Sequence, residues 1–433
     1  LQQLHQSTVV SLSLSSVFVI GALIGRVWTG INITRIGMKR LLYIGGLIFL
    51  VLTFGYYLTT NIPLLFLIRV IQGAGFGIGA TASGTIAGHV VPASRRGEGI
   101  GYYALSVTLA AAVGPALSIM IYSSLGFGSL LGIALGLLVI TFILIFFVRV
   151  KEFSAEERAY ALAHEPKGVE RYIEKSALPI SIIAFLAGFI DSAILTGMGS
   201  FSTDLKIPLA GSLFFTMYAV LIFVSRPFTG RLFDTKGDNW IFNPTFIFFA
   251  VAMLLVGLAG FFSPAIGFVV LLIAGGAFGL GYGGVAPFGQ AIAIRDSSKD
   301  RIGVATSTFF GFLDLGVGGG PIVLGAIIPM LGNGMLGFRN LYLYSAPAVV
   351  IVWIIYYLIH GKHRIGVATS TFFGFLDLGV GGGPIVLGAI IPMLGNGMLG
   401  FRNLYLYSAP AVVIVWIIYY LIHGKHQKSS SKV

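Results

Sequence analysis

Long apolar runs follow one another along most of the chain, and short polar segments separate them. A run of about 20 apolar residues is what an α-helix needs to cross the hydrocarbon core of a bilayer. Eleven distinct runs reach this length, and the expected spans cover residues 9–31, 41–60, 63–90, 100–122, 126–149, 178–200, 208–231, 241–262, 264–291, 303–330 and 337–360. The pattern therefore predicts an all-α, multi-pass (polytopic) membrane protein.

The last two runs occur twice, because residues 301–363 and 364–426 are identical at every position. The second copy adds expected spans at 366–393 and 400–423, which brings the number of spans to thirteen. A repeat without one substitution indicates a recent in-frame duplication or an assembly error, not an old structural repeat. Two spans form a hairpin, so the insertion inverts nothing downstream. We expect the first copy to occupy the native place and the second to lie at the periphery of its bundle.

Composition agrees with a membrane protein. The chain is 56% hydrophobic and 10% charged, whereas soluble domains carry about 25% charged residues. The basic residues that give the net charge of +12 lie between the apolar runs. This placement is typical of the loops of membrane proteins and does not indicate nucleic-acid binding. The chain has no cysteine, which excludes disulfides and Cys-ligated metal sites.

Lys and Arg gather in alternate connections between the expected spans. The basic set comprises residues 35–40, 95–96, 149–175, 231–236, 295–301 and 362–364, together with the C-terminal tail. The other set holds only Lys206, Arg339 and Arg402. Because cytoplasmic loops carry the excess of Lys and Arg, the basic set and the C-terminus are expected in the cytoplasm. We expect the protein to lie in the plasma (cell inner) membrane.

The segment 151–176 interrupts the apolar pattern with a high density of charged residues. It predicts a cytoplasmic connector that contains an amphipathic helix. This connector divides the chain into an N-terminal bundle with five spans (1–150) and a C-terminal bundle with six spans (177–363). Residues 364–433 then comprise the copied hairpin and a basic cytoplasmic tail.

A fainter repeat relates the two sides of the connector. Three motifs recur in the same order at nearly constant offset: Arg26–Gly30 and Arg226–Gly230, residues 73–79 and 275–281, and Gly114-Pro115 and Gly320-Pro321. Such echoes indicate two homologous halves in parallel, as in transporters whose repeats are related by an axis along the membrane normal. Since the second half has six spans, we expect that the first lacks its opening span.

Sequence motifs in both halves carry a family resemblance. The loop pattern G-x-x-x-D-R-x-G-R-R is partly kept by Gly30, Arg35, Gly37 and Lys39, with Thr34 at the usual Asp, and by Gly230, Asp234 and Gly237. The fourth-span pattern R-x-x-Q-G-x-G is intact over residues 69–75, and the exporter pattern G-x-x-x-G-P-x-x-G-G is partly kept around Gly114-Pro115. With its charged central loop, the chain resembles the major facilitator superfamily (MFS), and within it the drug and metabolite exporters.

This resemblance implies an MFS fold of two six-helix bundles and a secondary active transporter that works by alternating access. The leading hypothesis is proton-coupled efflux of a small molecule by an antiporter, with a monomeric chain in the lipid bilayer and no cofactor. Two alternatives stay open: an uptake symporter or facilitator, and a non-transporting membrane sensor or damaged gene product. No phosphate-binding loop supports an ATP-driven pump, and no catalytic motif indicates an enzyme.

Charged residues inside the expected spans are the best pointers to the mechanism, because a charge in the bilayer is costly unless it is paired or faces water. Asp191 and Asp314, with Asp377 as the copy of Asp314, are candidate acceptors of a coupling proton. Arg69 and Gln72 of the fourth-span motif are expected to modulate the proton and substrate pathway. The alternative is that each charge is held in a structural pair.

A second set of residues is expected to control the conformation. In the resembling family, the loops of these motifs hold the two halves together on the cytoplasmic side. The residues that match are Gly30, Arg35 and Gly37, and in the second half Arg226, Gly230, Arg231 and Asp234. The alternative for the basic residues is simple positive-inside topology. The pairs Gly114-Pro115 and Gly320-Pro321 are expected to bend their helices.

Overall fold

The computed structural model describes residues 8–59, 61–332 and 334–360. The second copy of the repeat, with Asp377 and the expected spans 366–393 and 400–423, lies outside these residues, so its predicted place stays a prediction. Residues 1–353 form one compact unit, and the described part of the other unit is residues 354–360.

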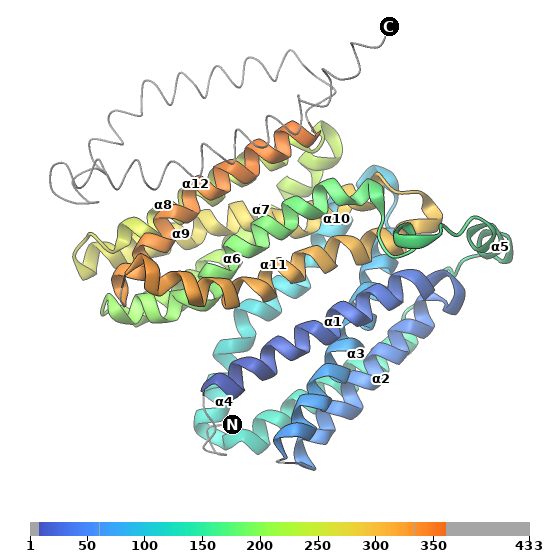
Figure 1. Ribbon diagram of the computed structural model, residues 1–433, viewed down its shortest axis with the longest axis horizontal. Helices are drawn as coiled ribbons and strands as arrows, with labels where there is room; N and C mark the ends of the chain where they lie inside the picture. Colours follow the sequence, from blue (N-terminus) through green and yellow to red (C-terminus); the bar gives the residue numbers. More distant parts are fainter. Residues whose placement is uncertain (1–7, 60, 333, 361–433) are drawn as a thin grey trace, which may run out of the picture. The chain divides into compact units, whose positions relative to one another are not determined.

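All regular structure in the described ranges is helical (Figure 1). The α-helices are α1 (Thr8–Ile36), α2 (Met38–Phe54), α3 (Ile62–Val90), α4 (Arg96–Phe147), α5 (Ala155–Ala163), α6 (Leu178–Asp204), α7 (Pro208–Lys236), α8 (Asn239–Ala259), α9 (Pro264–Gly281), α10 (Val285–Arg295), α11 (Ile302–Leu331) and α12 (Met335–His360). Ten helical segments of the described residues are long and apolar enough to cross a membrane. The all-α, multi-pass fold is therefore confirmed.

Helix α4 covers the two spans that the sequence predicts at 100–122 and 126–149. It has 52 residues, which is about 78 Å of helix against a hydrocarbon core of about 30 Å. Its backbone leaves helical geometry at Gly126, with φ 78° and ψ 176°, a positive φ that favours glycine. The second part of α4, Ser124–Phe147, is one of the ten candidate spans among the described residues. The helical break at Gly126 lies at the boundary between these two predicted spans, and the expected bend at Gly114-Pro115 stays a prediction.

The segment predicted as the span 264–291 contains a second break. Helix α9 ends at Gly281, where φ is −81° and ψ is −92°. A 3₁₀ turn, Tyr282–Gly284, follows, and α10 begins at Val285. The turn exposes backbone groups that an uninterrupted helix would pair internally, which matters for the residues that lie around it.

Glycines let α3 pack directly on α1. A Cβ atom built on Gly73 would collide with the carbonyl oxygen of Phe18, and one on Gly77 with that of Ala22. Residues 73–79 therefore form a helix-packing surface, as small residues in membrane helices usually do.

The echo of this motif, residues 275–281, does the same for α9 and α7. A Cβ on Gly275 would lie 2.5 Å from the carbonyl oxygen of Phe214, and one on Gly279 would lie 2.5 Å from that of Tyr218. The α1–α3 pair and the α7–α9 pair are thus built by the same rule, which gives the internal sequence repeat a structural counterpart.

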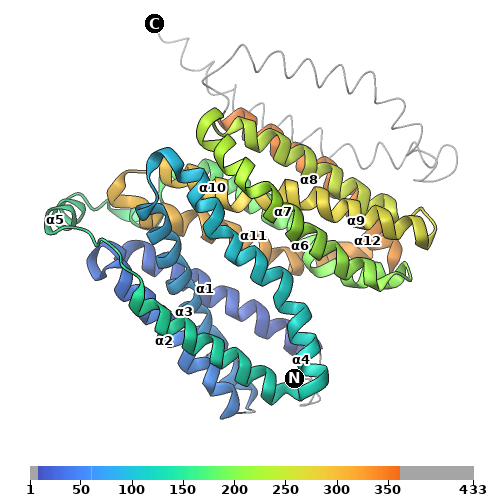
Figure 2. The ribbon, with the colours of Figure 1, turned by 180° about the vertical axis from the view of Figure 1, so that it is seen from behind.

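Within residues 1–353, two groups of helices pack among themselves. The N-terminal group contains α1, α2, α3 and α4, and the C-terminal group contains α6 to α11 with the first part of α12. The groups meet where α1 lies along α11 and where the first part of α4 lies along α7 and α10 (Figure 1, Figure 2). The predicted division into bundles at 1–150 and 177–363 stays a prediction.

The predicted connector helix is present as α5, between the two groups in sequence. Ser154 and Glu157 form a capping box at its start: Glu157 N donates to Ser154 Oγ (3.1 Å) and Ser154 N donates to the Glu157 carboxylate (2.8 Å). The hydrogen bond from the Ser154 backbone holds the pKa of Glu157 below its usual value. The sequence S-A-E-E, with Ser three residues before a Glu, is a local signal for such a helix start.

The connector also caps α2. Gly37, with φ 103°, offers no side chain as a cap, and Glu152 accepts hydrogen bonds from Met38 N (2.9 Å) and Lys39 N (2.7 Å). A Cβ on Gly37 would lie 3.2 Å from this carboxylate. The predicted motif residue Gly37 therefore provides both a left-handed turn and room for the cap.

Candidate functional site

An ion pair joins the two groups in the middle of the helices. Arg26 of α1 donates from Nε to Asp314 Oδ2 of α11 at 2.6 Å, and the Arg26 side chain is only 5% exposed. The guanidinium also lies over the rings of Phe76 (5.7 Å) and Phe310 (5.2 Å). Asp314 was predicted from the sequence as a site residue, whereas Arg26 was noted only as part of the internal repeat. The available signal was that an Arg in an apolar run needs an acid.

The same two helices approach closely beside this pair. A Cβ on Gly30 would lie 2.7 Å from the Ser307 side chain, and Ser307 Oγ donates to the backbone oxygen of Arg26 at 2.8 Å. Gly303 faces Ile33 in the same way. The predicted residue Gly30 thus lies at the contact between the groups.

Asp191 lies apart from the ion pair, inside the C-terminal group. Its residue is 4% exposed, and Tyr282 of the 3₁₀ turn between α9 and α10 is a polar neighbour of its carboxylate. It forms no ion pair with any described Lys or Arg. The structure therefore separates the two predicted acids by their partners: Asp314 has a cation and Asp191 has a tyrosine.

The Gly320-Pro321 pair lies where α11 packs on α6. Helix α11 continues through both residues, and a Cβ on Gly320 would collide with Ser192 Oγ, next to Asp191. Gly320 thus permits close packing beside the buried acid. Gly114, its echo in α4, has no neighbouring atom within 4 Å.

Arg69 and Gln72 are brought together, but not with either acid. Tyr56 donates to Gln72 Oε1 (2.5 Å), Arg69 Nη1 lies 3.4 Å from the same oxygen, and Gln72 Nε2 donates to Thr53 (2.8 Å). The Arg69 guanidinium lies over the Tyr56 ring at 5.4 Å. These contacts lie within the N-terminal group, between α2 and α3.

The end of α7 meets the start of α4. Asp234 accepts hydrogen bonds from the backbone N–H groups of Gly97 (2.7 Å) and Glu98 (2.9 Å). Arg231 pairs with the Glu98 side chain at 3.3 Å, and a Cβ on Gly230 would lie 2.7 Å from Glu98 Cα. A carboxylate at a helix N-terminus is favoured by the unpaired N–H groups and by the helix dipole. Three predicted residues of α7 therefore act on one helix end of the other group.

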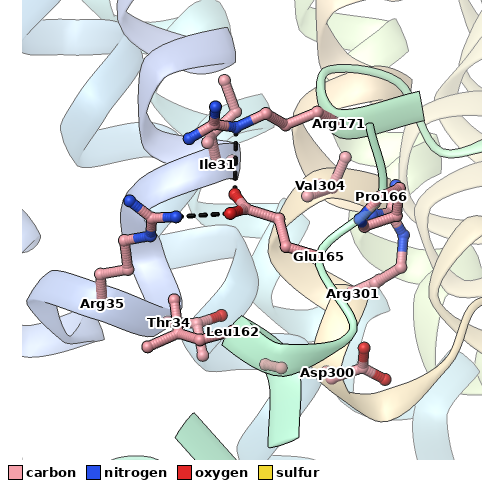
Figure 3. Close-up of a pocket in the computed structure, with 12 residues that line it drawn as sticks. Ile31, Thr34, Arg35, Leu162, Glu165, Pro166, Arg171, Asp300, Arg301 and Val304 are labelled. Atoms are coloured by element: carbon pink, nitrogen blue, oxygen red, sulfur yellow. Dashed lines mark hydrogen bonds and ion pairs between the residues drawn. The ribbon is translucent and has the colours of Figure 1, made fainter. Parts of the chain in front are cut away.

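The connector reaches both groups through charged side chains (Figure 3). Glu165 pairs with Arg35 of α1 (2.5 Å) and with Arg171 (3.0 Å). Glu174 pairs with Arg301, which precedes α11. The predicted residue Arg35 thus has a connector partner. Its pairing was not predictable from local sequence, because Arg35 and Glu165 lie far apart along the chain.

Two cavities lie at this end of the helices. The smaller one, of about 40 Å³, is the one drawn in Figure 3 and lies between α1, the connector and the start of α11. The larger one, of about 540 Å³, is lined by both groups and by α5, through residues that include His89, Arg96, Tyr160 and Lys299. Its lining mixes acidic and basic side chains and selects no single ligand charge.

Two helical groups of a membrane-spanning fold meet through buried polar contacts. The sequence profile of the Major Facilitator Superfamily matches residues 1–321 and 180–369, so the chain belongs to this family. It is an MFS transporter and not an enzyme.

A curated relative agrees with the family. The chain is 23% identical over 369 residues to the "Staphylopine export protein" of Staphylococcus aureus, and the match covers 81% of this chain and 87% of that protein.

Solved structures have the same fold. An MFS transporter, FucP, in the outward conformation has a TM-score of 0.59 at 13% identity, with 82% of this chain and 90% of that chain covered. The proton:xylose symporter XylE has a TM-score of 0.59 at 15% identity, with 81% and 88% covered. At these identities the likeness shows the fold alone.

Proposed function

We propose that this transporter is a proton-coupled exporter of a small molecule that works as an antiporter by alternating access. The observation that carries the proposal is the buried Arg26–Asp314 pair, because it links two helices that belong to different groups. Alternating access requires these groups to separate on one side and then on the other. A buried pair across the contact is a natural element for controlling that step.

The hydrogen bonds that join the groups support a conformation closed at the end that carries the basic loops. They involve Asp234 with the start of α4, Gln290 with the backbone of Gly84 (3.1 Å), and the Arg26 pair in the middle of the helices. If the basic loops are cytoplasmic, as the positive-inside rule predicts, this conformation is closed toward the cytoplasm.

In our proposal Asp191 carries the proton. A buried carboxylate without a cation pays a large desolvation cost when it is charged, so the dry site favours its neutral form. A charged Asp191 would favour a conformation in which water reaches it. Release and uptake of the proton therefore bias the two conformations differently, which is the requirement for coupling. Asp314, held by Arg26, serves the contact between the groups instead.

Export rather than uptake is supported by two sequence-level observations. The curated relative is named as an export protein, and the exporter motif is partly kept around Gly114-Pro115. We further propose a monomer in the plasma membrane with the basic loops and the C-terminus in the cytoplasm. The distribution of Lys and Arg supports this orientation.

The test begins with a growth screen for toxic compounds whose effect is relieved when the chain is expressed. The purified protein is then placed in liposomes with an internal pH dye, and one such compound is added. Proton flux induced by the compound is expected for the wild type and absent for Asp191→Asn, which should still exchange the compound across the membrane. Asp204→Asn, at the exposed end of the same helix, is the matched control. Normal proton flux in Asp191→Asn would refute the assignment, and net compound movement toward the basic-loop side would refute export.

A further inference from the structure

Arg226 is a buried cation that the contacts described so far leave without an anion. It lies ten residues before the end of α7, just as Arg26 lies ten residues before the end of α1. Its residue is 3% exposed, one nitrogen donates to the backbone oxygen of Gly283 (3.1 Å), and the guanidinium lies over the Phe288 ring at 5.6 Å. Its Nε is buried without a hydrogen-bond partner.

The repeat shows which acid Arg226 lacks. Asp314, the partner of Arg26, lies six residues before Gly320, and the residue six before Gly114 in the first half is Thr108. Thr108 is neutral, and its hydroxyl donates to the backbone oxygen of Ala104 at 3.2 Å. Of the two equivalent arginines, only Arg26 therefore has an ion-pair partner among the described residues.

An unpaired buried charge costs several kcal/mol in a membrane protein, and such residues mark ligand or ion pathways. The planar guanidinium binds carboxylate and phosphate groups through two parallel hydrogen bonds, and it stays charged when buried. A free Nε beside an occupied nitrogen is a donor that only an additional acceptor can use.

The surroundings of Arg226 point to a ligand site independently. The break between α9 and α10 lies against it, because Gly283 belongs to the 3₁₀ turn Tyr282–Gly284. Broken helices in the middle of the membrane form the substrate sites of many transporters. Tyr282 stacks on Phe278 and Tyr218 is tilted against it, at 5.5 Å and 5.3 Å between ring centres, and both tyrosines are only partly buried. These rings provide an amphipathic wall beside the cation.

We propose that Arg226 binds an anionic group of the transported molecule, so that the substrate is an organic acid with a carboxylate that takes the place of the missing protein acid. The proposal rests on the alternating-access function given above. In the present conformation α4 covers the site, since a Cβ on Gly101 would lie 2.9 Å from Arg226 Cδ. Separation of α4 from α7 uncovers Arg226 from the end with the basic loops, the side from which an exporter loads.

The test uses the absence of cysteine in the chain. Thr108→Cys introduces one thiol where the repeat predicts the missing acid. The assay compares the rates at which this thiol reacts with two methanethiosulfonate reagents of similar size, one with a sulfonate and one with a trimethylammonium group. After normalisation to a free thiol, the anionic reagent should react about tenfold faster in the presence of Arg226, because one nearby charge raises the local anion concentration. Arg226→Gln should abolish this preference, and Arg226→Lys should keep it.

Gly136→Cys is the control, since it lies on the second part of α4 with no neighbour within 4 Å of its Cβ position; its reagent preference should not respond to Arg226→Gln. Equal rates at Thr108→Cys, an unchanged preference in Arg226→Gln, or no reaction with either reagent would each overturn the anion site. The predicted preference in a protein that shows no compound-driven proton flux would instead refute the proposed coupling and leave the anion site standing.

Discussion

The Arg26–Asp314 pair allows a quantitative prediction about the balance between conformations. Asp314→Asn leaves the Arg26 guanidinium, 5% exposed, without its carboxylate. Removing one partner of a buried pair costs about 3–5 kcal/mol. Because the Asp314 side chain is 24% exposed, we expect the lower end, about 3 kcal/mol, in the conformation that contains the pair. This is a shift of about 100-fold in the equilibrium toward a conformation in which the groups have separated.

The assay is a distance measurement between spin labels on Arg40→Cys and Lys236→Cys. Both positions are exposed, each belongs to a different group, and the chain has no other cysteine. The parent should give mainly the short distance of the closed basic end, and Asp314→Asn should populate a longer one.

The double variant Arg26→Gln with Asp314→Asn is the control for an orphaned charge. It removes both charges, so it should shift the distances less than Asp314→Asn alone. The reasoning would be refuted if Asp314→Asn kept the parent distribution, or if the double variant shifted further than the single one.

Three other predictions concern contacts with different expected strengths. Asp234→Asn weakens the acceptor that caps the start of α4, and such a cap is worth about 0.5–2 kcal/mol. This variant should therefore lengthen the distance between the two spin labels less than Asp314→Asn does, and a larger effect would contradict this ranking. Gly77→Leu should prevent α1–α3 packing and abolish a monodisperse peak in size-exclusion chromatography, whereas Gly136→Ala, in open space, should elute normally. Glu165→Gln breaks two partly exposed pairs, with Arg35 and Arg171, each worth about 0–1 kcal/mol. The melting temperature of this variant should change by no more than a few degrees, and a large drop would show that the connector contributes more than its exposure suggests.

Much of the membrane architecture was accessible from local sequence. Apolar runs of sufficient length must become helices because the bilayer offers no partner for backbone groups, and the described helices follow them. Small residues in membrane helices usually permit close packing, and the space around Gly73 and Gly77 agrees with this rule. The break at Gly126 lies where two predicted spans meet. The break at Gly281, inside the predicted span 264–291, was missed, because a glycine in an apolar run is equally compatible with a continuous helix and with a turn.

Less of the candidate site than of the fold could be predicted from the sequence. The apolar runs indicated a multi-pass membrane protein, and the motifs indicated a transporter through their resemblance to a family. Asp191 and Asp314 were singled out because a charge within an apolar run is costly wherever the run folds. Only the tertiary structure decided that Asp314 pairs with Arg26, that Asp191 meets Tyr282, and that Arg226 is left without an acid. The cost of burying a charge depends on one residue in its own segment, whereas a partner depends on how two helices pack. Arg26 and Asp314 lie 288 residues apart in the chain, so no local pattern could pair them.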